Sequence, residues 1–120
     1  MKIIVLSDGC LIEKDIPNQL KDLQHEVKGQ LEKVSFIDEF NKHSIITLVN
    51  EDGKMLNEVP QLVVAHEIYI VDILVGNVLF VGFDGVSDFC GLSDEQIAII
   101  KRTLRKKIPY KGEMVYVIDQ

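Results

Sequence analysis

An aspartate inside a long apolar run is the residue of this chain best placed to do chemistry. Asp72 lies within the β-branched segment Ile68–Val75. A carboxylate buried without a partner is costly, so we expect Asp72 to face solvent, to pair with a base or to line a pocket. If Asp84 or Glu67 lay close to Asp72 in a cleft, two carboxylates could share acid–base work. Asp72 and Asp84 are therefore candidate contacts for a ligand or partner.

A basic cluster near the C-terminus is the second candidate. Residues 101–120 carry six bases and two acids, a charge of +4, and the preceding hundred residues carry seven bases and seventeen acids, a charge of −10. Such a cluster could bind phosphates, but the helix dipole also favours bases at a helix end. No aromatic residue for base stacking is interleaved. Nucleic-acid association is thus an alternative function, carried by Lys101, Arg102, Arg105 and Lys106.

The remaining side chains do not form a recognisable catalytic or metal motif. No serine stands in a G-x-S-x-G context, and Cys10 and Cys90 have no patterned histidine beside them. The two cysteines are expected to be reduced thiols that serve as small core residues. The three histidines are isolated, without the spacing of paired zinc ligands. We expect no cofactor, no metal and no enzymatic activity.

Length and composition predict one globular domain spanning residues 1–120. Apolar residues make up 47% of the 120 residues, which is enough for a core without metals or disulfides. No apolar stretch is long enough for a membrane helix, and only four apolar residues follow Lys2 where a signal peptide would continue. We therefore expect a cytoplasmic protein without membrane association.

The hydrophobic periodicity changes several times along the chain. We expect a helix over Leu20–Val27, ended by Gly29, and a second helix that starts at a capping box formed by Ser93 and Gln96 and ends at Pro109. The other segments read as strands. They are residues 2–6, 10–16, 31–37, 44–49, 54–59, 68–75, 78–83 and 114–118. Strand 54–59 returns from a turn at 50–53 and is stopped by Pro60. Strands 68–75 and 78–83 are expected to form a hairpin around Gly76 and Asn77.

Together these elements predict an α+β fold. We expect a mostly antiparallel β-sheet with two helices packed on one face, the stripes Leu20/Leu23/Val27 and Ile97/Ile100/Leu104 meeting the strands. A sheet with some parallel pairing is the rival, because helices separate several of the strands.

Four stretches also carry a resemblance to a known family. They are residues 23–32 (a helix end with Gly29 and Leu31-Glu32), the turn Asn50–Lys54, the run Val71–Gly76 and the helix start Phe89–Gln96. In order and spacing they resemble domain of unknown function 3846, a family met mainly in bacteriophages, plasmids and their Gram-positive hosts. The chain departs from the family after Pro60, where Gln61 and Leu62 replace a polar Asn-Arg pair. The resemblance implies a genomic setting but does not indicate an activity.

These observations favour a non-catalytic binding module, an accessory protein of a phage or mobile element that engages a host protein or a small ligand. The break in the family pattern points to exposed apolar residues around Gln61–Ala65 as a contact surface. A homo-oligomer is compatible with the same surface. Nucleic-acid binding and an enzyme built around Asp72 remain the alternatives.

Overall fold

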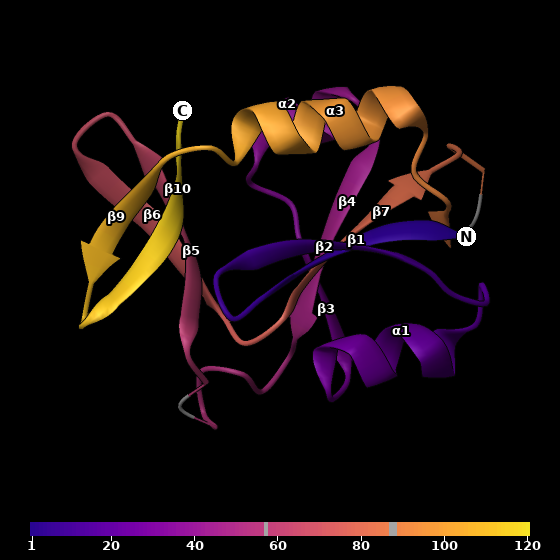
Figure 1. Cartoon of the computed structure of the whole chain (residues 1–120), viewed down its shortest axis with the longest axis horizontal. Helices are drawn as coiled ribbons and strands as arrows, with labels where there is room; N and C mark the ends of the chain where they lie inside the picture. The colour runs from indigo at the N-terminus through magenta and orange to yellow at the C-terminus, as the bar shows by residue number, and fades with distance from the viewer. Residues whose placement is uncertain (57, 87–88) are drawn as a thin grey trace.

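Two β-sheets lie side by side in the structure, with the helices gathered around the larger one (Figure 1). A computed structural model describes residues 1–56, 58–86 and 89–120. Among these residues the larger sheet has the strand order β2-β1-β7-β4-β3, with β8 paired to β7, and the smaller sheet has the order β6-β5-β10-β9. The strands of the larger sheet are β1 (Lys2–Ser7), β2 (Cys10–Asp15), β3 (Leu31–Val34), β4 (Ile45–Asn50), β7 (Val78–Phe83) and β8 (Phe89–Cys90). Those of the smaller sheet are β5 (Pro60–His66), β6 (Tyr69–Val75), β9 (Lys107–Tyr110) and β10 (Glu113–Asp119).

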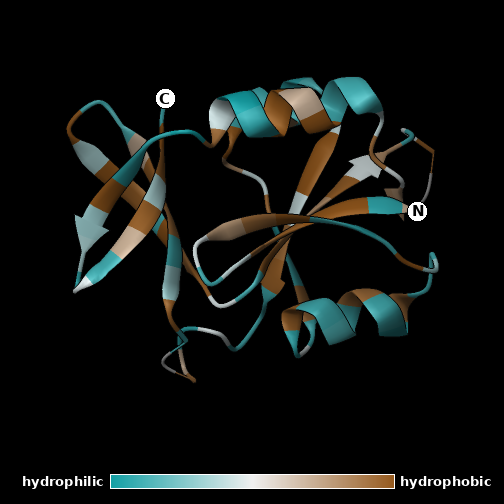
Figure 2. Ribbon diagram, in the orientation of Figure 1, coloured by the Kyte–Doolittle hydropathy of each residue, from teal (hydrophilic) through white to brown (hydrophobic). Residues whose placement is uncertain are grey.

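The larger sheet is covered on both faces, because its central strands are apolar on both sides. Helix α1 (Leu20–Val27) packs against one face, where its Leu23 and Val27 join Ile3 and Val5 of β1. Helices α2 (Asp38–Lys42) and α3 (Asp94–Thr103) pack against the other face. In Figure 2 the central strands are mainly hydrophobic, whereas α1 and α3 are hydrophilic along much of their length. The α+β class is confirmed, but the expected helices Leu20–Val27 and 93–107 lie on opposite faces of the sheet and not on one.

The helix signals in the sequence correspond to caps at two of the four ends of α1 and α3. The Ser93 hydroxyl accepts the Gln96 backbone N–H, and the Gln96 side chain accepts the Ser93 N–H, as the capping box predicts. Helix α1 ends where Lys28 adopts a left-handed conformation next to Gly29. Helix α3 ends at Thr103, however, and Pro109 lies inside β9. The short α2 is too brief for its periodicity to be read.

The predicted hairpin around Gly76 and Asn77 is wrong. Strand β6 pairs with β5 in the smaller sheet, whereas β7 pairs with β1 and β4 in the larger one. The Gly76–Asn77 segment therefore carries the chain from one sheet to the other, with Gly76 at φ +69°. A two-residue turn favours antiparallel pairing only if nothing better competes for both strands, and here each strand has other partners.

The segment around Pro60 also differs from its prediction. Residues 51–56 form turns instead of the start of a returning strand, and Asn57 lies outside the described residues. Pro60 begins β5, which pairs with β10 in parallel and with β6 antiparallel. The smaller sheet thus contains the parallel pairing that the rival prediction allowed.

One apolar cluster joins the two sheets. It combines residues of the larger sheet and of α2 and α3 with Leu62, Val64, Leu74 and Ile118 of the smaller sheet. Inside it, the ring of Phe40 from α2 meets that of Phe80 edge-on, with 5.3 Å between the ring centroids. The inner face of the smaller sheet is therefore buried, and its outer face is left to form a site. None of the helices among the described residues combines the length and the apolar character that crossing a membrane requires.

Candidate functional site

The helices of the described residues, α1, α2 and α3, lie beside the larger sheet and leave the outer face of the smaller sheet without a helix over it (Figure 1). Leu62, Leu74 and Val64 point into the shared core, so their neighbours along the strands point outward. Ile73, Val63 and Val117 form one outward row across β6, β5 and β10. Val63 is buried even so, which shows that neighbouring side chains close over the centre of this face.

An open groove of about 440 Å³ lies on this part of the molecule, and we call it the outer groove. Its volume falls within the range of small-molecule sites. Its apolar lining comes from β5 and β6 and its far wall from the turn between β9 and β10. The apolar residues are Pro60, Ile70, Ile73 and Val75, the aromatic residue is Tyr110, and the charged residues are Lys54, Glu58, Asp72 and Lys111.

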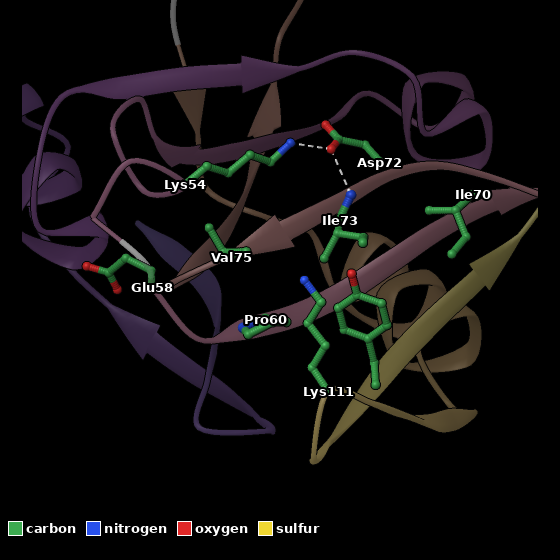
Figure 3. A pocket seen from close by; sticks show the side chains of 9 residues that line it. Lys54, Glu58, Pro60, Ile70, Asp72, Ile73, Val75 and Lys111 are labelled. Atoms are coloured by element: carbon green, nitrogen blue, oxygen red, sulfur yellow. Dashed lines mark hydrogen bonds and ion pairs between the residues drawn. The ribbon is translucent and has the colours of Figure 1, made fainter.

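An ion pair marks one side of the outer groove. The Lys54 ammonium contacts Oδ1 of Asp72, and the same oxygen accepts the Ile73 backbone N–H at 2.7 Å. Figure 3 shows Lys54 and Asp72 on one side of β6 and Lys111 on the other. The Asp72 side chain is 29% exposed. The expectation that Asp72 would be paired or solvated is thereby confirmed, and Asp72 also lines a pocket.

A second, smaller cavity of about 130 Å³ lies next to the outer groove. Both hollows are lined by Lys54, Asp72, Ile73 and Val75, so the ion pair forms part of their common boundary. The smaller cavity adds Val49 at the end of β4, together with residues such as Glu32 and Glu51. Two acids thus lie behind the ion pair, and one base, Lys111, lies across the outer groove.

The carboxylates proposed as catalytic partners of Asp72 lie elsewhere. Asp84 directly follows β7, a strand of the larger sheet, and is exposed. Its side chain accepts the Val86 N–H at 2.9 Å. Glu67 lies in the turn between β5 and β6, five residues from Asp72 and therefore on the order of 15 Å away along the hairpin. Within the described residues there is no group of three or more metal-ligating side chains. The structure thus does not bring these carboxylates together as an acid–base pair.

The basic cluster is exposed at the end of α3. Lys101 forms an ion pair with Glu13 of β2 at 2.7 Å, and Lys107 donates to the Gly9 carbonyl at 2.8 Å. Arg102, Arg105 and Lys106 are exposed. Part of the cluster therefore attaches the helix end to the β1–β2 hairpin, and the remaining three bases face solvent.

Two other sequence predictions are corrected by burial. Residues Gln61–Ala65 were expected to offer an exposed apolar surface, but Gln61–Val64 are buried and Ala65 is half-buried, because β5 is an inner strand. Gln61 takes a structural role where the family pattern breaks, since its Oε1 accepts the Gly9 N–H at 2.9 Å. Cys10, expected in the core, is exposed, whereas Cys90 is half-buried and free. Burial, with the nearby Asp84 charge, raises the pKa of the Cys90 thiol.

Sequence reasoning missed Tyr110, Lys111 and Glu58. The Lys111 ammonium lies 5.5 Å from the centroid of the Tyr110 ring, which places a cation beside an aromatic face in the groove wall. The positive φ angles of Lys111 and Gly112 form the turn that presents them. The Tyr-Lys-Gly turn was the available signal, but its position opposite β6 depends on strand pairing distant in sequence.

The fold and the groove define a small α+β protein with two sheets around a shared core and an open site on the smaller sheet. A family model described as Domain of unknown function (DUF3846) matches residues 1–105, and the chain belongs to this family. No curated protein and no solved structure matches the chain significantly. The predicted family is therefore confirmed. The groove wall formed by Tyr110 and Lys111 lies outside the matched residues.

Proposed function

We propose that this protein is a non-catalytic binding module whose outer groove takes a small amphipathic ligand with a planar apolar body and an anionic group. The observation that carries the proposal is the combination of an apolar lining with an aromatic wall and charged residues at the edge. Small-molecule sites are commonly mostly apolar, with a few polar groups that fix orientation.

The ligand chemistry follows from which side chains are already engaged. Lys54 is held by Asp72, whereas the ion pairs found among the described residues do not include Lys111. A planar ring could stack on Tyr110 while its anionic group meets the Lys111 ammonium. Ile73 and Val75 would contact the opposite side of the ring.

Binding of 1-anilinonaphthalene-8-sulfonate provides a direct test, because this dye has a naphthalene ring and one sulfonate. We expect saturable binding at one site. Dye fluorescence measures the affinity, and shifts of the amide resonances of residues 70–75 locate the site. Tyr110→Ala should weaken binding about tenfold, the loss expected for one aromatic contact with its buried area. Lys111→Gln should weaken it less, because the charge interaction is partly screened.

Tyr69→Ala is the matched control, because Tyr69 is an exposed tyrosine at the start of β6, in the same sheet as Tyr110, and does not line the outer groove. Equal loss of dye binding in Tyr69→Ala and Tyr110→Ala would contradict a site in the groove. Far-UV circular dichroism must be unchanged in both variants, since partly unfolded proteins also bind this dye.

The cellular setting is part of the same proposal. The resemblance to a phage- and plasmid-associated family supports an accessory protein that works in the cytoplasm. Nucleic-acid association through Arg102, Arg105 and Lys106 is the alternative. A band shift at low salt that disappears in Arg102→Glu/Arg105→Glu would favour the alternative over the ligand module.

A further inference from the structure

Gln61 is a buried polar residue that a break in the sheet turns away from its strand neighbours. It is 5% exposed. The register of β5 against β6 shifts between Pro60 and Leu62, so Gln61 has no partner in β6, and the pairing of β5 with β10 begins only at Leu62. A β-bulge of this kind redirects a side chain, and bulges are frequent beside functional sites. Here the side chain reaches the turn between β1 and β2, where its Oε1 accepts the Gly9 N–H at 2.9 Å.

The contact with Gly9 fixes the orientation of the Gln61 amide and leaves its nitrogen free to donate elsewhere. Because the Gly9 N–H needs an acceptor, the amide oxygen faces it and Nε2 points away. Among the described residues, Oδ2 of Asp22 is the one fully enclosed side-chain nitrogen or oxygen that lacks a hydrogen-bond partner. The Gln61 nitrogen is therefore not sealed inside the protein, and a ligand with an acceptor can reach it.

A hollow of about 220 Å³ lies beside Gln61, and we call it the junction pocket because both sheets contribute to it. Its walls are the turn between β1 and β2, the start of β5 and the start of β10. Its volume is below the roughly 300–1,000 Å³ of sites for larger ligands, so it suits a group about the size of one amino-acid residue. Among the described residues it shares only Pro60 with the outer groove. Its other lining residues are Asp8, Gly9, Val59, Gln61, Glu113 and Met114.

The charges at the junction pocket favour a cation. The ionisable residues found in its lining are two exposed acids, Asp8 and Glu113. The ion pairs found among the described residues include neither of them. Lys107, a neighbouring base, is engaged, because its ammonium donates to the Gly9 carbonyl at 2.8 Å and lies 4.7 Å from the centroid of the Tyr116 ring. The pocket therefore combines one buried donor with two unpaired carboxylates.

We infer that the junction pocket binds an α-amino amide, in which an ammonium group and an amide carbonyl are attached to the same carbon. The carbonyl accepts a hydrogen bond from Gln61 Nε2, and the ammonium lies between Asp8 and Glu113. The ligand's side chain contacts Val59 and Met114. An anion would meet two acids, and a simple amine would leave the Gln61 donor unsatisfied. The amino terminus of a peptide and a free small molecule can both present this chemistry. This site does not rest on the proposed function of the outer groove.

Nuclear magnetic resonance titration of the isotope-labelled protein with L-leucinamide tests the inference. At a pH of about 6.5 the α-amino group of the probe is protonated. We expect saturable shifts of the Gly9 backbone amide and of the Gln61 side-chain amide. N-acetyl-leucinamide lacks the cation and isoamylamine lacks the carbonyl, so each should bind at least fivefold more weakly. The peptide Leu-Gly-Gly-amide distinguishes the sources: tighter binding than leucinamide indicates a peptide terminus, weaker binding indicates a small molecule, and both support the site.

Substitutions separate a ligand contact from a structural one. Gln61→Met removes the donor and should abolish the preference for leucinamide over isoamylamine, which a purely structural role would not change. Asp8→Asn and Glu113→Gln should each weaken leucinamide binding about two- to fivefold, because water screens exposed charges, and the double variant should lose about tenfold. Asp119→Asn is the matched control, since Asp119 is an exposed acid at the other end of β10 and does not line the pocket.

The probes and the acid variants do not require Gln61→Met to fold. Equal binding of leucinamide and N-acetyl-leucinamide would overturn the inference, as would equal affinity of the double variant and Asp119→Asn. Shifts that leave Gly9 unaffected, or no saturation up to about 50 mM leucinamide, would overturn it as well. Tyr110→Ala should leave leucinamide binding unchanged, and Asp8→Asn should leave dye binding in the outer groove unchanged, so the two proposals fail separately.

Discussion

Oδ1 of Asp72 contacts both the Lys54 ammonium and the Ile73 backbone N–H. Lys54 is 62% exposed and Asp72 is 29% exposed, so water screens the charge interaction between them. The hydrogen bond to Ile73 is less accessible to solvent and is made at the edge of a sheet. Asp72 therefore contributes to order along β6 more through the backbone contact than through the ion pair.

Two substitutions separate these contributions at the residue scale. Lys54→Met should change the free energy of unfolding by less than about 1 kcal/mol. Asp72→Ala also removes the acceptor for Ile73 and should cost about 1–2 kcal/mol. Asp72→Asn keeps an oxygen near that N–H and should fall between them. Urea denaturation of the three variants measures the order, and an Asp72→Ala protein as stable as Lys54→Met would show that the backbone contact contributes nothing.

The elements were predictable where their signals are local. The capping box, the strand Lys2–Leu6 and the helix Leu20–Val27 correspond to α3, β1 and α1 because caps and periodicity act within a few residues. The partners of β6 and β7 were not predictable from the sequence. Both strands are apolar, and β6 pairs with β5 whereas the larger sheet takes up β7. For the same reason, the residues of the outer groove could be predicted only in part. Asp72 could be named from its apolar surroundings, but Tyr110 and Lys111 reach it only through the parallel pairing of β10 with β5.

At the start of α3, Gln96 does more than close the capping box. Its Nε2 donates to the carbonyl oxygens of His43 and Ser44, each at 3.0 Å, and so joins the helix to the beginning of β4. Glutamate at this position normally serves a capping box as well as glutamine does. Here Gln96→Glu would lose both donations and place a carboxylate against two carbonyl oxygens.

We therefore expect Gln96→Glu to lower the free energy of unfolding by about 1–3 kcal/mol, although the capping pattern is preserved. Glu95→Gln, in the same exposed first turn, is the control and should stay within about 0.5 kcal/mol of the natural protein. Chemical denaturation followed by circular dichroism compares the two. If Gln96→Glu proved as stable as Glu95→Gln, the contacts to His43 and Ser44 would have no energetic role.

On the scale of the whole molecule, the family match and the core have different boundaries. The match ends at residue 105, yet β9 and β10 follow it and complete the smaller sheet. β10 lies between β5 and β9, with Tyr116–Asp119 aligned on Leu62–Ala65. Val115 and Ile118 are buried, and Ile118 belongs to the cluster that joins the two sheets. The last fifteen residues are thus part of the core and also supply one wall of the outer groove.

Deletion of residues 106–120 should abolish cooperative unfolding, because β5 would lose a hydrogen-bonded neighbour and the shared core would be opened to water. Ile118→Ala tests the same idea with less disruption and should cost about 2–4 kcal/mol. Met114→Ala on the same strand is the control: Met114 is 56% exposed, so the change should stay below about 1 kcal/mol. Amide hydrogen exchange, measured at increasing temperature, reports on the two sheets separately. In Ile118→Ala the amides of both sheets should lose protection at the same temperature. A shortened chain with an unchanged melting midpoint would mean that residues 1–105 fold without β10 and that the smaller sheet is an addition to their core.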